Sequence, residues 1–293
     1  MSTTRPQSST GIGERIRLEF RRNRLAAIGA GMVGVLGLVV VFGPTIVPHD
    51  PMEHAHANRL QGPSLEHPLG TDELGRDVLA RLVYGARVSL GIAILVTAIR
   101  VVLGTVVGLV AGYVGGIVDE LLMRLVDIQL AFPGLILALV IAGILGPSLR
   151  NLMIALAVVG WSTYARVVRG SVLSVKERDY VTAAQLVAMS RRRIAIRHLL
   201  PSVIHPVMVL ATLNLGTVVL ATAGLSFIGL GAQPPTPEWG TMIDSGSNYI
   251  LDAWWLVTAP GVAIMFTVMG FNLLGDGIRD FLDPKQQGRL EEI

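Results

Sequence analysis

The stretch LAAIGAGMVGVLGLVVVFGPTIV, residues 25–47, contains 23 consecutive residues without a charge. A helix needs about 20 predominantly apolar residues to cross the hydrocarbon core of a bilayer, because only a fully hydrogen-bonded backbone is tolerated there. The whole chain of 293 residues shares this character, since 52% of its residues are apolar, 15% are charged and its mean hydropathy is +0.59. Soluble domains carry about 25% charged residues. The composition therefore argues against a cytosolic enzyme and excludes an intrinsically disordered chain.

Five more apolar runs follow the first, so the sequence predicts an all-α polytopic membrane protein with six transmembrane helices. The first run is too long for a signal peptide and lacks a small-residue cleavage site, which favours a retained span. The expected spans are 25–47, 88–112, 128–149, 151–169, 203–231 and 253–275. The expected organisation is a basic interfacial helix (1–24), a first transmembrane helix (25–48), an extracytoplasmic loop (49–86), a five-helix core (87–280) containing a cytoplasmic loop (170–203), and a cytoplasmic tail (281–293).

The basic residues indicate how the chain lies in the membrane. Six arginines fall within residues 1–24 and seven more between residues 166 and 197, whereas residues 232–252 hold no Lys or Arg. Because Lys and Arg favour the cytoplasmic side, we expect both termini in the cytoplasm and the chain in the cytoplasmic (inner) membrane. Ile12, Ile16 and Phe20 are spaced by four among the first arginines, which is typical of a basic helix in the headgroup region. A disordered basic tail is the alternative.

Two features inside the expected spans carry structural information. Gly104, Gly108 and Gly112 recur every fourth residue, which predicts one helical face that a neighbouring backbone can approach closely. Arg100 lies in the middle of a span, where a charge costs about 2.5 to 3.5 kcal/mol and therefore needs a partner. Asp127 is one candidate partner. The alternative is that Arg100 lines a pathway and meets an anion such as a peptide carboxylate.

The loop between the fourth and fifth spans is long, and its composition is not that of a disordered segment. Loops of this length usually have a function or are disordered. Tyr180, Ala183, Ala184 and Val187 fall at helical spacing, and Ser190 is a candidate N-cap for a second helix, residues 191–200, that Pro201 would stop. This pattern predicts a compact helical protrusion. Its basic surface suits either anionic lipid or a soluble partner.

The loop also carries a family resemblance. Thr182-Ala183-Ala184, then Ala188 after three residues, then Leu200-Pro201 after eleven more, resembles the "EAA, three residues, G, eleven residues, LP" loop of importer permeases in the ATP-binding-cassette superfamily. Thr182 replaces the Glu that is usual in that family, which removes a charge. Ala188 replaces the usual Gly, and this replacement predicts a turn without a positive φ, which Ala tolerates poorly.

Longer strings extend the resemblance over most of the chain. HPLGTDELGRDVLARLVYGARVSL (67–90), AFPGLILAL (131–139), GLSFIGLGAQPPTPEWGTMI (224–243) and the segment 254–285 are similar to the second permease subunit of dipeptide, oligopeptide and nickel importers. This resemblance implies a type I importer permease fold. Thr222 stands at a position where these relatives often carry Glu.

The resemblance implies a transport function without catalysis in this chain. Its expected partners are a second homologous permease, two cytoplasmic ATPases, an extracytoplasmic substrate-binding protein and the lipid bilayer, with no nucleic acid. ATP and Mg would belong to the ATPases, since the only two lysines, Lys176 and Lys285, do not follow the glycine of a P-loop. No cofactor is expected here, and the substrate is open among peptides, nickel and other solutes. The implied ATPase-coupling residues are Arg178, Tyr180, Thr182, Ala183, Ala184, Ala188, Met189, Ser190, Leu200 and Pro201.

Three other interpretations were weighed against this one. An intramembrane serine protease could use Ser162 or Ser226, but no His follows residue 205 to serve Ser226 as a base. An ion-driven secondary transporter should show inverted repeats and acids at mid-depth, and neither is evident. The first external segment holds His49, His54, His56 and His67, which lack the tight spacing of a metal site. We therefore predict no metal site, with a weak delivery site as the alternative.

Overall fold

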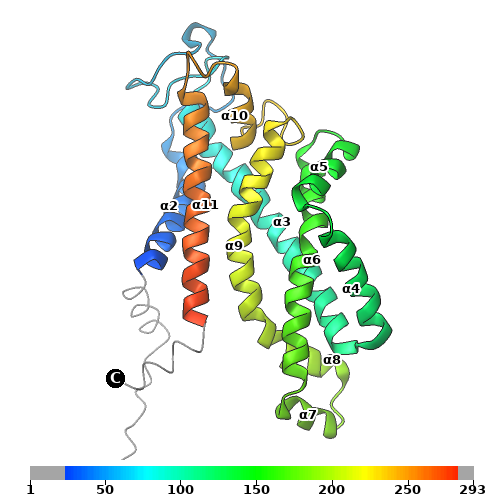
Figure 1. The fold of residues 1–293 in the computed structure, drawn as a ribbon. Coiled ribbons are helices and arrows are strands. Elements are labelled where there is room, and N and C mark those ends of the chain that lie inside the picture. Colours follow the sequence, from blue (N-terminus) through cyan, green and yellow to red (C-terminus); the bar gives the residue numbers. More distant parts are fainter. Residues whose placement is uncertain (1–23, 283–293) are drawn as a thin grey trace, which may run out of the picture.

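The computed structural model describes residues 24–282, and within these residues the chain is helical with no strand. The all-α class is therefore confirmed, while the predicted helix within residues 1–24 and nearly all of the predicted tail lie outside the described residues. The elements, coloured along the chain in Figure 1, are α2 (Arg24–Ile46), η1 (His56–Asn58), α3 (Val78–Val114), α4 (Gly116–Leu130), α5 (Gly134–Leu145), α6 (Leu149–Lys176), α7 (Asp179–Leu186), α8 (Arg191–Ile194), η2 (Ala195–Leu199), α9 (Leu200–Phe227), α10 (Trp239–Ser247) and α11 (Trp255–Leu282).

Among residues 24–282, five helices are long and apolar enough to cross a membrane, or six if one bent pair forms a single span. The pair is α4 and α5, which meet at an angle of 87°. The span expected over residues 128–149 therefore covers the end of α4, the bend and α5 rather than one continuous helix. Pro133 provides the physical reason, because proline lacks a backbone N–H and disfavours helical geometry in the residue before it. The run Ala131–Phe132–Pro133 accordingly separates the two helices.

The spans form two neighbouring groups (Figure 1). In the first group α2 lies along α11, which also packs on α9. In the second, α6 packs along α3, and α4 and α5 lie against α6. Since α3 also contacts α9, it joins the groups. Residues 47–77 and 228–254, with α10, gather at one end of the molecule, here called the loop end, and α7 and α8 lie at the opposite end.

The close approach of α3 and α6 depends on the glycines that the sequence singled out. A Cβ on Gly108 would lie 2.8 Å from Cβ of Val168, and one on Gly112 would lie 2.9 Å from Cβ of Val172. A Cβ on Gly104 would overlap the α6 backbone at Trp161. Distances under 3.0 Å are shorter than carbon contacts allow, so all three positions require glycine. The predicted close helix contact is therefore present.

The helix α3 begins earlier than the apolar pattern predicts. It is 37 residues long and starts at Val78, whereas the expected span starts at Val88. Asp77 caps it, since its Oδ1 accepts a hydrogen bond from the backbone N–H of Ala80 at 2.7 Å. Residues 78–86 were therefore assigned wrongly to a loop. Hydropathy locates only the part of a helix that lies in lipid. Arg81 and Arg87 interrupt the apolar pattern on the N-terminal side of residue 88, so the pattern does not reach the start of α3.

The loop end is held together by buried polar groups. Asp72 accepts a hydrogen bond from Nε of Arg76 at 2.6 Å. Glu238 is fully buried at the start of α10 and accepts from the backbone N–H of Thr241 and from Oγ of Ser89 on α3, both at 3.0 Å. Because buried carboxylates need such partners, these contacts fix α10 on α3.

Adding one methyl group to the glycine face should separate α3 from α6. We expect Gly108→Ala to lower the stability of the purified chain by about 1 to 3 kcal/mol, because the new Cβ would overlap the backbone carbonyl of Ala165. Gly91→Ala on the same helix is the matched control, since a Cβ there meets nothing within 4 Å. Thermal unfolding in one detergent measures both, and equal midpoints for the two variants would contradict the assigned contact.

Candidate functional site

The segment 177–199 forms a compact projection, which we call the knob, at the end of the molecule opposite the loop end (Figure 1). It consists of α7, a turn at Ala188, α8 and η2. It connects α6 directly to α9. Of the loop predicted over residues 170–203, residues 170–176 belong to α6 and residues 200–203 belong to α9. The knob is therefore shorter than predicted and is continuous with two long helices.

The inner side of the knob is packed against the helices that carry it. Val181 and Ala184 of α7 are buried in a hydrophobic cluster together with Ile194 and Leu199. The remaining members of this cluster lie on α6 and α9: Tyr164, Val168, Val172, Val175, Val203 and Val207. Asn214 Nδ2 of α9 also donates to the Tyr164 hydroxyl at 3.1 Å. This cluster therefore connects α7 to both α6 and α9.

The outer side of the knob exposes large apolar side chains. Leu186 is 83% exposed, Val187 is 74% exposed, and Tyr180 and Ile196 are also exposed. The sequence placed Val187 on the same helical face as Ala184, but Val187 lies in the turn after α7 and points away from the cluster. Arginines flank this apolar surface: Arg178, Arg191, Arg192, Arg193 and Arg197 are exposed.

The turn at Ala188 differs from the sequence expectation. Ala188 has φ = +55°, in the left-handed region, so the prediction that this turn needs no positive φ is wrong. The turn closes the end of α7, because the backbone N–H of Met189 donates to the carbonyl of Ala184 at 3.2 Å. An alanine here carries a conformational cost of about 1 kcal/mol that glycine avoids. Thr182, the other departure from the family pattern, lies exposed on α7.

The second helix of the knob does not stop at Pro201. Ser190 occupies the N-cap position of α8, but its side chain makes no capping hydrogen bond. α8 passes through the π-turn η2 into α9, and Pro201 lies in the first turn of α9. The proline removes one backbone donor, and the helix nevertheless continues from Arg191 to Phe227. The predicted end at Pro201 is therefore wrong.

Ion pairs fasten α4 to α6 above the knob. Arg169 of α6 donates from Nε and Nη2 to the two carboxylate oxygens of Asp119 on α4, at 2.6 and 2.7 Å. Arg166 pairs with Asp127, about two turns further along α4. Asp127 is therefore not the partner of Arg100, and that expectation is wrong. Nothing in the sequence indicates the pairing of Asp119 with Arg169, because the two residues are 50 positions apart and meet only where α4 packs on α6.

Arg100 is bound within its own chain. Its Nε and Nη2 donate to the Leu156 carbonyl of α6 at 2.8 and 2.6 Å, and the residue is only 8% exposed. Gly160, one turn along α6, leaves the space for the guanidinium, since a Cβ there would overlap it. This geometry favours a structural role for Arg100 over contact with a transported anion.

The serines of the protease interpretation lack a base. Ser162 Oγ is 3.5 Å from the Val159 carbonyl, and Ser226 Oγ is buried without a hydrogen-bond partner among the described residues. His198 lies in the knob, where its ring is 6.0 Å from that of Tyr180. The arrangement offers exposed surface for binding rather than an activated nucleophile.

Comparison with known proteins identifies the class. Residues 104–288 match the family described as the inner membrane component of binding-protein-dependent transport systems, and residues 13–63 match the N-terminal transmembrane domain of oligopeptide transport permease C. The first match covers more than half of the chain, which therefore belongs to this family of multi-pass inner-membrane permeases. The resemblance seen in the sequence is confirmed.

Individual relatives are similar over nearly their full length. The dipeptide transport system permease protein DppC of Escherichia coli K12 is 46% identical over 272 residues, 91% of each chain. The protein of the same name from Alkalihalophilus pseudofirmus is 44% identical over 269 residues, 92% of this chain and 88% of that one. The glutathione transport system permease protein GsiD of E. coli O6:K15:H31 is 41% identical over 270 residues, 92% and 89% of the two chains. These relatives are transport permeases and not enzymes.

One solved structure confirms the fold. The inward-facing MetNI methionine ABC transporter contains a chain that matches this one with a TM-score of 0.56 and 20% sequence identity. The match covers 69% of this chain and 96% of that chain. The type I importer permease fold implied by the sequence is therefore present.

The left-handed conformation of Ala188 predicts that glycine stabilises the knob at this position and destabilises it at Ala183. We expect Ala188→Gly to stabilise the knob by about 1 kcal/mol, and Ala183→Gly, within α7, to destabilise it by about 1 kcal/mol. Hydrogen exchange of the α7 amides measures both effects. Faster exchange in both variants would contradict the conformation of Ala188.

The Arg100 contact predicts non-additivity between two positions. We expect Gly160→Ala to cost about 2 kcal/mol by displacing the guanidinium, and to cost less than half as much in a chain that already carries Arg100→Ala. Chemical denaturation of the two single variants and the double variant measures the coupling. Additive costs would contradict the assigned contact.

Proposed function

We propose that this chain is the membrane-spanning permease subunit of an ATP-driven importer of short peptides, and that its knob is the surface to which the ATPase subunits couple. Membership of the binding-protein-dependent family supports the importer, and the names of the dipeptide and glutathione relatives support peptide substrates. The observation that carries the coupling role is the exposed apolar surface of Tyr180, Leu186 and Val187. Such a surface on an ordered projection requires a partner.

The proposed partners would supply the activities that an importer needs besides this permease. The chain has no glycine-lysine P-loop sequence, so separate ATPases would bind ATP and Mg. A second homologous permease would complete the translocation pathway, and an extracytoplasmic binding protein would deliver the substrate. The choice between a dipeptide, a longer peptide, nickel or another solute would then rest largely on the binding protein.

The distribution of charge supports the orientation. The knob exposes five arginines, whereas residues 232–252 at the loop end contain no Lys or Arg. Positive residues favour the cytoplasmic side, so the knob would face the cytoplasm, together with both termini. The loop end would then face the binding protein.

The contacts of the knob support a mechanical mechanism. The cluster under α7 joins it to α6 and α9, α6 is fitted against α3 along the glycines, and the pair Arg169–Asp119 holds α4. Closure of the ATPases would therefore move these helices largely as one body, which is a rigid-body alternation of access. Changing the populations of two states from 1:99 to 99:1 requires about 5.5 kcal/mol of differential binding.

Two substitutions on the outer surface test the coupling role. We expect the double variant Leu186→Asp/Val187→Asp to reduce ATP-dependent uptake of a labelled dipeptide at least tenfold, because charges would replace contacts typically worth about 2 kcal/mol each at an interface centre. Uptake is measured in proteoliposomes containing the complete complex. Copurification of the ATPase subunits is expected to fall in parallel.

The matched control is Leu65→Asp at the loop end, where Leu65 is fully exposed. It adds a negative charge at an exposed apolar position without touching the knob, and should leave ATPase copurification unchanged. Normal uptake by the Leu186/Val187 variant would reject the coupling role. Uptake of the dipeptide by the purified chain without ATPases would reject the importer as a whole.

A further inference from the structure

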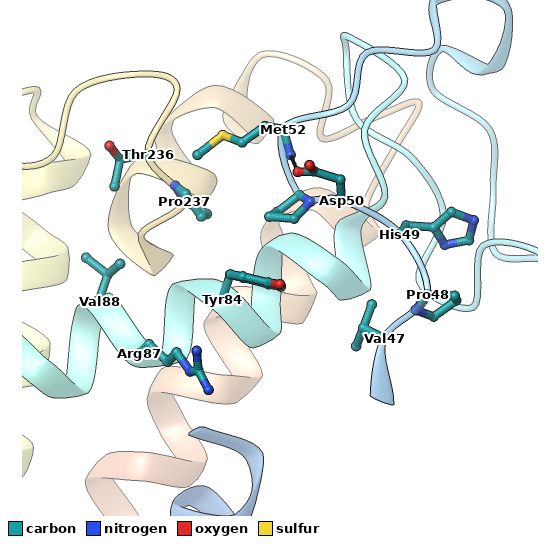
Figure 2. Close-up of a pocket in the computed structure, with 11 residues that line it drawn as sticks. Val47, Pro48, His49, Asp50, Met52, Tyr84, Arg87, Val88, Thr236 and Pro237 are labelled. Atoms are coloured by element: carbon teal, nitrogen blue, oxygen red, sulfur yellow. Dashed lines mark hydrogen bonds between the residues drawn. The ribbon is translucent and has the colours of Figure 1, made fainter. Parts of the chain in front are cut away.

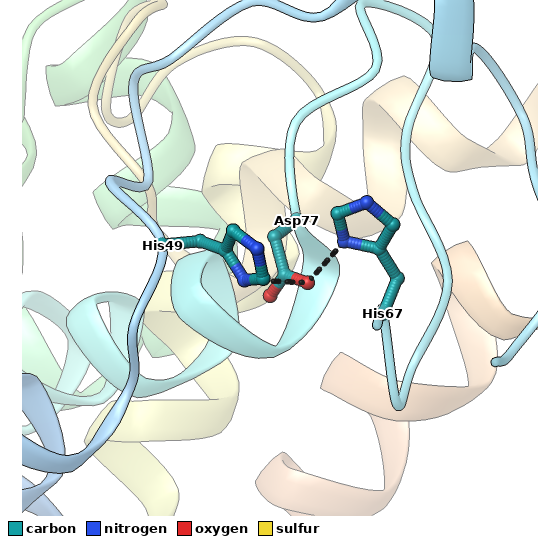
Figure 3. A group of neighbouring side chains, drawn as sticks. All are labelled: His49, His67 and Asp77. Atoms are coloured by element: carbon teal, nitrogen blue, oxygen red, sulfur yellow. Dashed lines mark hydrogen bonds and ion pairs between the residues drawn. The ribbon is translucent and has the colours of Figure 1, made fainter. Parts of the chain in front are cut away.

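Three side chains converge at the loop end although they are distant in sequence (Figure 3). His49 follows α2, His67 lies in the loop and Asp77 precedes α3. One nitrogen of each histidine and one carboxylate oxygen lie within 4.8 Å of one another. Nδ1 of His67 is 2.8 Å, and Nδ1 of His49 3.6 Å, from Oδ2 of Asp77. The sequence analysis expected no such site, because spacings of 18 and 10 residues gave no sign of convergence.

Two members of the group, His67 and Asp77, are buried, the His49 side chain is 32% exposed, and two of the ring nitrogens lack a hydrogen-bond partner among the described residues. His67 is 6% exposed and Asp77 is 3% exposed. Nδ1 of His49 and Nε2 of His67 are both buried without a hydrogen-bond partner among the described residues. Buried polar atoms of this kind normally have a partner, and leaving one unsatisfied costs about 1 to 3 kcal/mol. The unsatisfied nitrogen of His49 lies next to a buried carboxylate.

The geometry and the ligand types suit a small divalent cation. Zn²⁺ binds His nitrogen and carboxylate oxygen at about 2.0 to 2.2 Å in tetrahedral sites, which places neighbouring ligand atoms roughly 3.3 Å apart. The 3.6 Å between His49 and Asp77 is close to that separation. The 2.8 Å hydrogen bond between His67 and Asp77 would open by about half an ångström, and the His67 proton would move from Nδ1 to Nε2.

The Asp77 carboxylate would keep its structural role in such a site. Its Oδ1 accepts from the backbone N–H of Ala80 and so caps α3, while Oδ2 faces both histidines. A carboxylate that is oriented by a hydrogen bond on one oxygen and binds metal through the other is a common arrangement. Two neutral imidazoles and one carboxylate would leave a fourth position for water.

An ion could reach the group from a cavity (Figure 2). His49 lines this cavity of about 610 Å³ together with Asp50, Met52 and Tyr84. The Arg87 side chain also lines it, but its guanidinium donates to the Val40 and Val41 carbonyls at 2.6 and 3.0 Å. That contact directs the Arg87 guanidinium toward α2.

From these observations we propose that His49, His67 and Asp77 form a binding site for a divalent transition metal ion of the Zn²⁺ type. The ion joins the end of α2, the loop 47–77 and the start of α3, so it fixes the loop end. It is a resident structural ion, and neither its binding nor its loss depends on which solute the protein transports.

Cobalt provides the direct test, because tetrahedral Co²⁺ absorbs visible light and reports its own ligands. The full chain, copurified with the other subunits of its complex and stripped with a chelator, is titrated with CoCl₂ and then with ZnCl₂. We expect about one equivalent per chain with a visible band that Zn²⁺ displaces. His49→Ala should weaken binding roughly tenfold or more. Zn²⁺ should raise the thermal midpoint of the unmodified complex and leave that of His49→Ala unchanged.

The double variant His54→Ala/His56→Ala is the matched control, because both histidines lie in the same segment and outside the group. Their rings are 6.0 Å apart. It should keep the band, the stoichiometry and the thermal shift. The proposal is overturned if the unmodified complex shows no saturable band, if His49→Ala keeps full binding, or if the control loses binding equally. His67→Gln, which should weaken binding as His49→Ala does, decides the matter should His49→Ala fail to fold.

Discussion

The contact between α3 and α6 organises the rest of this molecule. Three glycines allow the two backbones to meet, and the contact encloses Arg100, whose charge is accommodated by a carbonyl of the opposite helix. In lipid, helices gain little from burying apolar surface, so close backbone approach and internal polar contacts hold them together. The ion pairs from α6 to α4 and the cluster beneath α7 extend the same unit to the knob. A force applied to the knob therefore acts on a connected set of helices.

The sequence predicted those features that depend on local pattern. The spans followed from apolar length, the α3 face from glycine spacing, and the family from strings in the loops. It failed where distant segments decide the outcome. The bend at Pro133 creates the pairing of Arg166 with Asp127, which no spacing indicates, and His49 meets Asp77 only after the loop has folded. Ala188 shows a different failure, because a residue that disfavours positive φ adopts it when the surrounding helices fix the turn.

The knob and the loop end are stabilised by different kinds of contact. Buried carboxylates and their donors hold the loop end from within. The knob instead is held to α6 and α9 by apolar contacts and leaves Leu186 and Val187 exposed. An inner surface that is fixed, combined with an outer surface that is apolar, fits the docking role proposed above, since such an element would bind a partner without reorganising. The exposed arginines around it add electrostatic attraction for an acidic partner.

α3 begins ten residues before its apolar run, and these residues extend the helix beyond the part expected to cross the membrane. A helix of 37 residues is about 55 Å long, whereas the hydrocarbon core is about 30 Å thick. Even at a 40° tilt, near the upper limit for spanning helices, roughly 26 residues suffice to cross it. The first ten residues of α3 therefore extend about 15 Å along the helix axis beyond the start of the apolar run. In the orientation proposed above, a binding protein would meet this end of α3 beyond the hydrocarbon core rather than within it.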